Sequence, residues 1–235
     1  MKNKLTVVTF LAIFLTAAGS VVGQKQPKPW KEWSKTDAQK VLNDSPWAHL
    51  QVDQDFQEPT PLTRPPDPSI DTRLKQNEGM TYGIRFFSAR PIRQAFVRMI
   101  QLQKKELPPA TVTRLNTFAE VLSEDSIIIA VTIENPDANM LGKAMQIVRN
   151  ASTPELKNTT YLERSDGKRV FLEQYTPPGP DGFGARFIFP RLLDGKPFLG
   201  PEHTMVRFVS DLGQSIKFHM TYKVKEMMLD GKLEY

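Results

Sequence analysis

One stretch, residues 81–105, constrains the fold of this chain more than any other. Its first part, from Tyr82 to Phe87, is rich in aromatic and β-branched residues, which favour a pleated, half-buried strand. Pro91 suits the first turn of a helix, where its missing N–H breaks no hydrogen bond. The stretch therefore predicts a strand that leads directly into an amphipathic helix, the Thr81–Lys105 unit. The residues that fall on one helical stripe are Ile92, Ala95, Phe96, Met99, Ile100 and Gln103.

The first residues have the pattern of a signal peptide. Lys2 and Lys4 are followed by an uncharged apolar run, residues 5–18, and then by the small residues Val21 and Gly23 at the −3 and −1 positions. The run is shorter than the ~20 residues that a spanning helix needs, although a membrane anchor is the alternative. We expect a signal peptide over residues 1–23, cleavage after Gly23, a secreted or periplasmic protein, and no membrane span in the mature chain.

Composition excludes several kinds of chemistry. The chain has no cysteine, so it has no disulfide, no cysteine nucleophile and no thiol for a lipid anchor. Its three histidines have no metal-ligand spacing, and no G-x-S-x-G run occurs. Removing Lys2 and Lys4 with the signal peptide lowers the net charge from +5 to +3, which makes no case for nucleic acid. We predict no catalytic residue, no metal ligand and no cofactor.

All three tryptophans lie in residues 24–50, an N-terminal Trp-rich arm. Ser34 and Asp37 form an S-x-x-D capping box that predicts a short helix over residues 35–42. One interpretation is that Trp30, Trp33 and Trp47 clamp this helix onto the body of the protein. The other is that they form an exposed aromatic patch for a partner protein or a sugar.

Residues 51–79 carry five prolines among polar residues and predict an extended linker. A globular domain is expected over residues 80–235. Within it, the hydrophobic run 126–133 predicts a central strand, and helices are expected over residues 111–122 and, after a cap at Asp137, 138–148.

The C-terminal part is expected to consist of β-hairpins. Asp-Gly-Lys occurs three times, beginning at Asp166, Asp194 and Asp230, and Asp-Gly favours the type I′ turn with positive φ at both central residues. The predicted fold is α+β, with a mostly antiparallel sheet packed by two or three helices. The strand pairs that this pattern predicts are 159–164 with 169–175, 205–210 with 215–222, and 226–229 with 233–235.

Basic residues cluster on the Thr81–Lys105 unit. Arginine side chains can bind a carboxylate or a phosphate with two parallel hydrogen bonds, but such clusters are also common on solvated helix faces. Arg93 and Lys104 fall off the apolar stripe, so an outer basic face is expected. The cluster consists of Arg85, Arg90, Arg93, Arg98, Lys104 and Lys105.

Three short runs carry a resemblance to a known group of proteins. They are Trp33-x-x-x-Asp37-Ala38-x-Lys40-x-Leu42-x-x-Ser45-Pro46-Trp47, Arg85-Phe86-Phe87-Ser88-Ala89-Arg90-Pro91-Ile92-Arg93, and Met227…Asp230-Gly231-Lys232-Leu233. Together they resemble uncharacterised exported bacterial proteins of the acidobacterial type. The resemblance implies an envelope or secreted location, and it supplies no activity or site residue.

Two functions follow as hypotheses. The first is a non-enzymatic cell-envelope or interaction protein that contacts a protein or glycan through Trp30, Trp33 and Trp47. The alternative is a hydrolase, or a protein that binds a small ligand or sugar, with its site on the Trp cluster or on the basic face formed by Arg85, Arg90 and Arg93.

Overall fold

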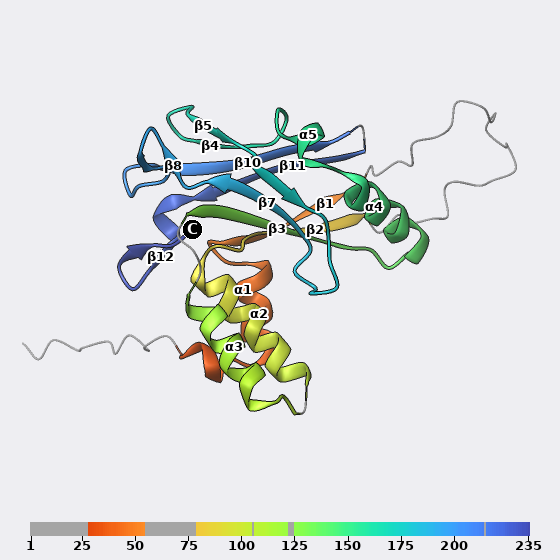
Figure 1. The fold of residues 1–235 in the computed structure, drawn as a ribbon, viewed down its shortest axis with the longest axis vertical. Helices are drawn as coiled ribbons and strands as arrows, with labels where there is room; N and C mark the ends of the chain where they lie inside the picture. The colour runs from red at the N-terminus through yellow and green to blue at the C-terminus, as the bar shows by residue number, and fades with distance from the viewer. Residues whose placement is uncertain (1–27, 55–78, 105, 122–124, 214) are drawn as a thin grey trace, which may run out of the picture.

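The fold consists of two antiparallel β-sheets packed face to face, with a helical bundle projecting from one of them (Figure 1). The computed structural model describes residues 28–54, 79–104, 106–121, 125–213 and 215–235. The predicted α+β class with antiparallel sheets is confirmed. The five-stranded sheet has the order β1 (Ala48–Asp53), β2 (Met80–Phe86), β3 (Ser126–Glu134), β7 (Ala185–Pro190) and β6 (Gln174–Thr176). The four-stranded sheet has the order β11 (Ile216–Lys223), β10 (Met205–Leu212), β4 (Tyr161–Arg164) and β5 (Arg169–Phe171).

The core lies between the two sheets and is largely aromatic. Phe187 packs against Phe208 with ring centroids 5.2 Å apart, and Phe86 packs against Tyr222 at 4.8 Å. All four side chains are fully buried, and each buried large apolar side chain contributes roughly 1.5–3 kcal/mol. The middle strand of the five-stranded sheet is β3, as predicted for residues 126–133. Alternation along each strand therefore gives the five-stranded sheet an inner aromatic face and an outer face that the bundle partly covers.

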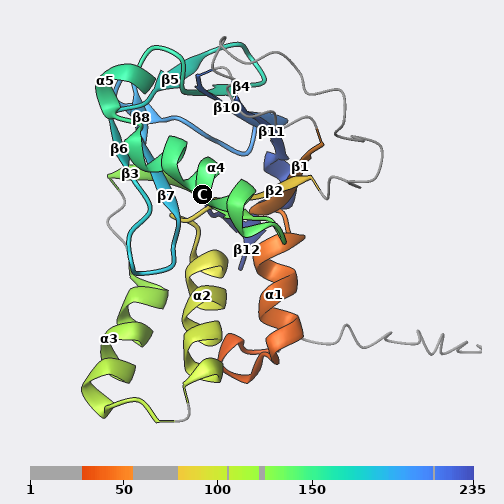
Figure 2. The same ribbon diagram turned by 90° about the vertical axis from the view of Figure 1, so that its right-hand side faces the viewer.

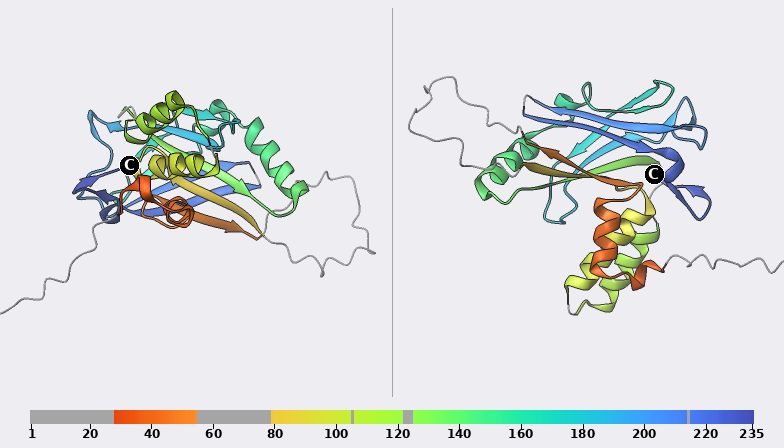
Figure 3. Two further views of the ribbon diagram at one scale, coloured as in Figure 1. Left: turned by 90° about the horizontal axis from the view of Figure 1, so that it is seen from below. Right: turned by 180° about the vertical axis from the view of Figure 1, so that it is seen from behind.

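The bundle contains α1 (Lys35–Asn43), α2 (Arg90–Gln103) and α3 (Pro109–Glu120), with α2 in contact with both of the others (Figures 2 and 3). The predicted capping box at the start of α1 is confirmed, because Ser34 Oγ accepts from Asp37 N–H at 3.1 Å and Asp37 accepts from Ser34 N–H at 2.8 Å. The set of buried positions predicted for α2 is only partly right. Gln103 is exposed and Val97 is fully buried, because α2 is covered on two sides. The remaining helices are η1 (Trp30–Glu32), α4 (Ala138–Asn150), α5 (Thr153–Leu156) and η2 (Val224–Glu226).

The N-terminal arm is part of the body of the protein. Strand β1 pairs with β2 along its whole length, from Ala48 opposite Arg85 to Asp53 opposite Met80. The predicted linker therefore begins inside a strand, and its remainder, like the predicted signal peptide, lies outside the described residues. Gln51 also joins the two sheets, since its amide donates to Lys217 O at 2.6 Å and accepts from His219 N–H at 3.2 Å.

The Asp-Gly-Lys turns fall in hairpins, as predicted, but they use two kinds of geometry. Asp194 and Asp230 have φ of 53° and 51°, and the glycine after each also has positive φ, as a type I′ turn requires. At Asp166 only the following glycine has positive φ, and the aspartate carboxylate instead binds the Arg164 guanidinium. The two short hairpins are β8 (Leu192–Leu193) with β9 (Lys196–Pro197), and β12 (Met228–Leu229) with β13 (Lys232–Leu233).

The other predicted pairings hold with one correction. Strands β10 and β11 pair from Met205 opposite Lys223 to Leu212 opposite Ile216, and β4 pairs with β5. The strand predicted over residues 169–175 is divided, however, because Gln174 begins β6 and pairs with Ile188 of the other sheet. The chain thus crosses from one sheet to the other directly after β5.

Candidate ligand-binding site

Two of the three tryptophans are buried. Trp30 and Trp47 are each only 8% exposed, and Trp33 is half-buried. Trp30 Nε1 donates to a Glu120 carboxylate oxygen at 2.8 Å, and Trp47 Nε1 donates to Glu234 O at 2.8 Å. The prediction of an exposed aromatic patch is therefore wrong for Trp30 and Trp47, whose rings hold the N-terminal segment against the body.

The arginines of the Thr81–Lys105 unit do not form a solvated basic face. Arg85 and Arg93 are 4% and 3% exposed, which contradicts the predicted outer position. Arg93 donates to Phe118 O at 3.1 Å, to Glu120 O at 3.5 Å and to Ser88 O. It thereby satisfies free carbonyl groups at the C-terminal end of α3, which the helix itself leaves without partners.

Arg90 and Arg98 also have structural partners, whereas Lys104 is exposed and Lys105 lies outside the described residues. Arg90, with a 27% exposed side chain, pairs with Asp230 at 2.9 Å and with Glu234 at 3.5 Å. Arg98 Nε donates to Trp33 O at 2.6 Å. These contacts fix η1 and the C-terminal hairpin to α2, so of the predicted basic face only Arg85 is left as a candidate for binding.

Arg85 donates four hydrogen bonds, all to uncharged oxygens. Nε donates to Leu42 O at 2.5 Å, Nη2 to Asn43 Oδ1 at 2.9 Å, and Nη1 to Gly83 O at 3.1 Å and Thr132 Oγ1 at 2.6 Å. Since a guanidinium has five N–H groups, one N–H on Nη2 is not used by these bonds. The bonds to Leu42 and Asn43 cap the C-terminal end of α1.

Gly83 makes this geometry possible. The guanidinium folds back over its own strand, and a Cβ atom at position 83 would lie 2.6 Å from Arg85 Cζ. The Phe96 ring flanks the group, with its centroid 5.8 Å from Cζ. A glycine within a strand pattern often marks such a close approach, so Gly83, two residues before Arg85, was the sequence signal for the site. Asn43, Thr132 and Phe183 gave no comparable signal.

A pocket of about 370 Å³ opens beside Arg85, between the outer face of the five-stranded sheet and the bundle. This volume lies within the range of small-ligand sites. One wall is apolar, and the rings around it pack at an angle to one another, with Phe183 centred 5.3 Å from Phe96, edge to face, and 4.9 Å from Phe87. The lining residues are Leu42, Phe96, Met99, Ile100 and Phe183 on the apolar side, and Gln39, Asn43, Arg85, Gln103, Thr132, Glu134, Asp181 and Gly182 elsewhere.

The wall of the pocket carries both signs of charge, the buried Arg85 guanidinium and the carboxylates of Glu134 and Asp181. Burial lowers the pKa of the Arg85 guanidinium, and the charge of Glu134 opposes this effect. The group stays protonated, because an arginine side chain is not deprotonated in proteins. Among the residues that the structure describes, no carboxylate forms an ion pair with Arg85. Asp181, also in the pocket wall, is bound to Arg186 at 2.8 Å and to Phe183 N–H at 3.0 Å.

A second basic pocket, of about 680 Å³, has its buried donors occupied. It lies beside β8 and β9 and includes Arg164 and His203 in its wall. Arg164 binds Asp166 at 2.7 and 2.9 Å and Phe198 O at 2.7 Å. His203 Nδ1 accepts from Gly200 N–H at 2.9 Å. The pocket beside Arg85 is therefore the better candidate for a ligand-binding site.

Comparisons with known proteins give no family. No family model and no curated protein matches the chain. One similar solved structure is a protein of unknown function from Burkholderia pseudomallei, with 9% identity, a TM-score of 0.41 and coverage of 60% of this chain and 74% of that one. Another is a DUF4426 family protein from Pseudomonas aeruginosa PAO1, with 13% identity, a TM-score of 0.31 and coverage of 62% and 87%. Both likenesses are too low to carry an argument.

Within the described ranges, no three His, Asp or Glu side chains converge as metal ligands would. Every helix that the structure describes is too short or too polar to cross a bilayer.

Proposed function

We propose that this chain is an exported, non-enzymatic binding protein that holds a small carboxylate ligand in the pocket beside Arg85. The observation that carries the proposal is the state of the Arg85 guanidinium. It is buried and charged, it lines the pocket, and within the described residues it has hydrogen bonds to neutral oxygens but no ion pair.

The physical reason is the cost of burying a charge. Taking a charge out of water costs several kcal/mol, and hydrogen bonds to neutral groups satisfy its donors without neutralising it. A ligand carboxylate beside the unused Nη2 N–H supplies both the opposite charge and a charge-assisted hydrogen bond, which contributes about 1.5–3 kcal/mol. Phe96, Met99 and Ile100 then take up the apolar body of the ligand.

The same geometry favours binding over hydrolysis. A hydrolase would need carboxylates free to act as acid and base. Of the two carboxylates in the pocket wall, Asp181 is held by Arg186 and by a backbone N–H, which leaves Glu134 without a second carboxylate to share the roles of acid and base. The partner-binding hypothesis depended on exposed tryptophans, and two of the three are buried. The sugar-binding hypothesis used the same tryptophans or the basic face, of which Arg85 and Arg93 are buried.

Binding is tested by calorimetry with hexanoate, hexanol and hexylammonium. We expect hexanoate to bind at least about tenfold more tightly than hexanol, the factor expected for one charge-assisted hydrogen bond. Met99→Trp fills the pocket without touching the bonds of Arg85, and it should abolish hexanoate binding. Phe171→Ala, at an exposed aromatic on β5, is the matched control. Equal affinity for hexanol, or full binding by Met99→Trp, would refute the proposed site.

Export is supported by Lys2, Lys4, the apolar run over residues 5–18 and Gly23. N-terminal sequencing of the protein from fractionated bacterial cells should give Gln24 as the first residue, in the periplasmic or extracellular fraction. A protein that keeps residues 1–23 and stays with the membranes would contradict this part of the proposal.

A further inference from the structure

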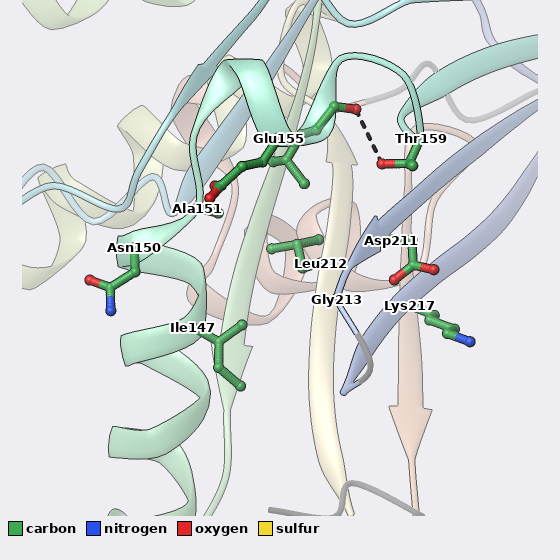
Figure 4. Close-up of a pocket in the computed structure, with 10 residues that line it drawn as sticks. Ile147, Asn150, Ala151, Glu155, Thr159, Asp211, Leu212, Gly213 and Lys217 are labelled. Atoms are coloured by element: carbon green, nitrogen blue, oxygen red, sulfur yellow. Dashed lines mark hydrogen bonds between the residues drawn. The ribbon is translucent and has the colours of Figure 1, made fainter. Parts of the chain in front are cut away.

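A different pocket, of about 660 Å³, lies between α4, α5 and the end of the β10–β11 hairpin (Figure 4). Its apolar side is formed by Ile147, Leu156 and Leu212. Figure 4 shows Ile147 on α4 facing the strands and Asp211 beside Lys217 on the opposite side. The other lining residues are Asn150, Ala151, Glu155, Thr159 and Gly213.

Two polar side chains of this pocket already have partners. Glu155 accepts from Ser152 N–H at 3.0 Å and from Ser152 Oγ at 2.8 Å, and so caps α5. The Thr159 hydroxyl donates to Leu156 O at 3.3 Å, the bond drawn in Figure 4. These groups maintain the shape of the pocket and have less capacity for a ligand.

Asp211 differs from them. Its Oδ1 is shielded from solvent and accepts no hydrogen bond within the described part of the chain. Lys217 is directly opposite in the β10–β11 register, yet the two side chains form no ion pair there within 4 Å. A shielded carboxylate oxygen without a donor is unfavourable, and such an exception requires an explanation.

In the described segments, two other buried side-chain atoms also have no hydrogen-bond partner, but their surroundings explain them differently. Tyr82 lies between the two sheets against Phe218, and Arg90 is ion-paired with Glu234. Asp211 is in a pocket wall and is only partly buried, so a ligand in the pocket can pair with its carboxylate group.

We propose that the Asp211 pocket binds a primary amine with an apolar body. The ammonium group pairs with the Asp211 carboxylate, and the body packs against Ile147, Leu156 and Leu212. The site is independent of Arg85 and has the opposite preference for charge.

The experiment measures the binding of hexylammonium to the mature chain by NMR titration and calorimetry. Hexanol and hexanoate are the comparison probes. We expect saturable binding of hexylammonium, at least about tenfold tighter than that of hexanol, with shifts confined to α4, α5 and the β10–β11 turn. Asp211→Asn should weaken this binding about tenfold or more and leave hexanol unchanged.

Asp194→Asn is the matched control. It removes one carboxylate at an exposed turn whose positive φ asparagine also tolerates, so amine binding should equal that of the wild type. Ile147→Trp keeps Asp211 and fills the pocket, so it should abolish binding of hexylammonium. This variant tests the proposal independently if Asp211→Asn proves unstable. The proposal is wrong if hexanol binds as tightly as hexylammonium, if Asp211→Asn binds the amine normally, or if Ile147→Trp does.

Discussion

The two candidate pockets contain charged groups of opposite sign, and each group lacks a different kind of partner. Beside Arg85, a buried cation has most of its hydrogen bonds and no ion-pair partner in the described chain. In the other pocket, Asp211 has an oxygen that lacks a hydrogen bond there altogether. What each group lacks indicates the ligand that would satisfy it, a carboxylate in one case and an ammonium in the other.

Arg85 and Asp211 also differ in their structural roles. Arg85 joins α1 to β2 and β3 through Leu42, Gly83 and Thr132, so the fold depends on it even without a ligand. Asp211 holds nothing through Oδ1. Arg85 therefore has both a structural role and a proposed binding role, whereas Asp211 has only a proposed binding role. Measurements of stability without ligand test this contrast.

The largest effect is expected for Arg85→Met. The substitution leaves Leu42 O and the Asn43 side chain without their donor in a buried place, so we expect a loss of about 3 kcal/mol in the free energy of unfolding. Urea denaturation measures it. Arg169→Met, at a 45% exposed arginine paired with Glu163, should change stability by at most about 1 kcal/mol. Equal losses in the two variants would show that Arg85 has no special structural role.

A smaller loss is expected for Gly83→Ala. The new Cβ would overlap the guanidinium, which four hydrogen bonds hold in place, so Arg85 must shift and we expect a loss of about 1–2 kcal/mol. Hexanoate binding should weaken with it. Gly142→Ala in α4 is the matched control, since its Cβ meets nothing within 4 Å, and it should stabilise the helix by about 0.5–1 kcal/mol. A neutral Gly83→Ala would mean that the guanidinium does not need its present position.

Asp211→Asn should not lower the free energy of unfolding, in contrast to Arg85→Met and Gly83→Ala. Without ligand, it replaces a shielded anionic oxygen that has no donor by a neutral amide, so we expect stability to stay constant or rise by at most about 1 kcal/mol. Thermal denaturation of this variant beside Asp194→Asn measures the difference. A clear loss of stability in Asp211→Asn alone would mean that the carboxylate has a structural role, and the contrast between the pockets would fail.

Local structure was largely predictable from the sequence, because it depends on neighbouring residues. The Ser34–Asp37 capping box, the hydrophobic strand at residues 126–134 and the Asp-Gly turns each follow from a few adjacent side chains. The burial of Arg93 did not follow, because it depends on α3 packing against α2 with its free carbonyl groups facing that side chain. Helical spacing describes one helix and does not reveal what covers its polar side.

The candidate site was predictable only in part, for the same reason. Arg85 was identified as a candidate, but on an exposed face. Its partners Leu42 and Thr132 come from segments 43 and 47 residues away along the chain. Asp211 was not identified at all, since an aspartate near a hairpin turn is ordinary until the structure shows that its oxygen lacks a donor.

The smallest effect is expected at Lys217. Among the described residues, its ammonium group is the only lysine or arginine charge in the wall of the Asp211 pocket, and it repels a cationic ligand across a partly exposed surface. Interactions of this kind contribute about 0.2–1 kcal/mol, so Lys217→Met should tighten hexylammonium binding by about two- to threefold at low salt. Hexanoate binding beside Arg85 should not change. Calorimetry at low and high salt separates the outcomes: weaker amine binding in Lys217→Met would show that Lys217 helps to hold the ligand, and the assignment of charge preference to the two pockets would then be wrong.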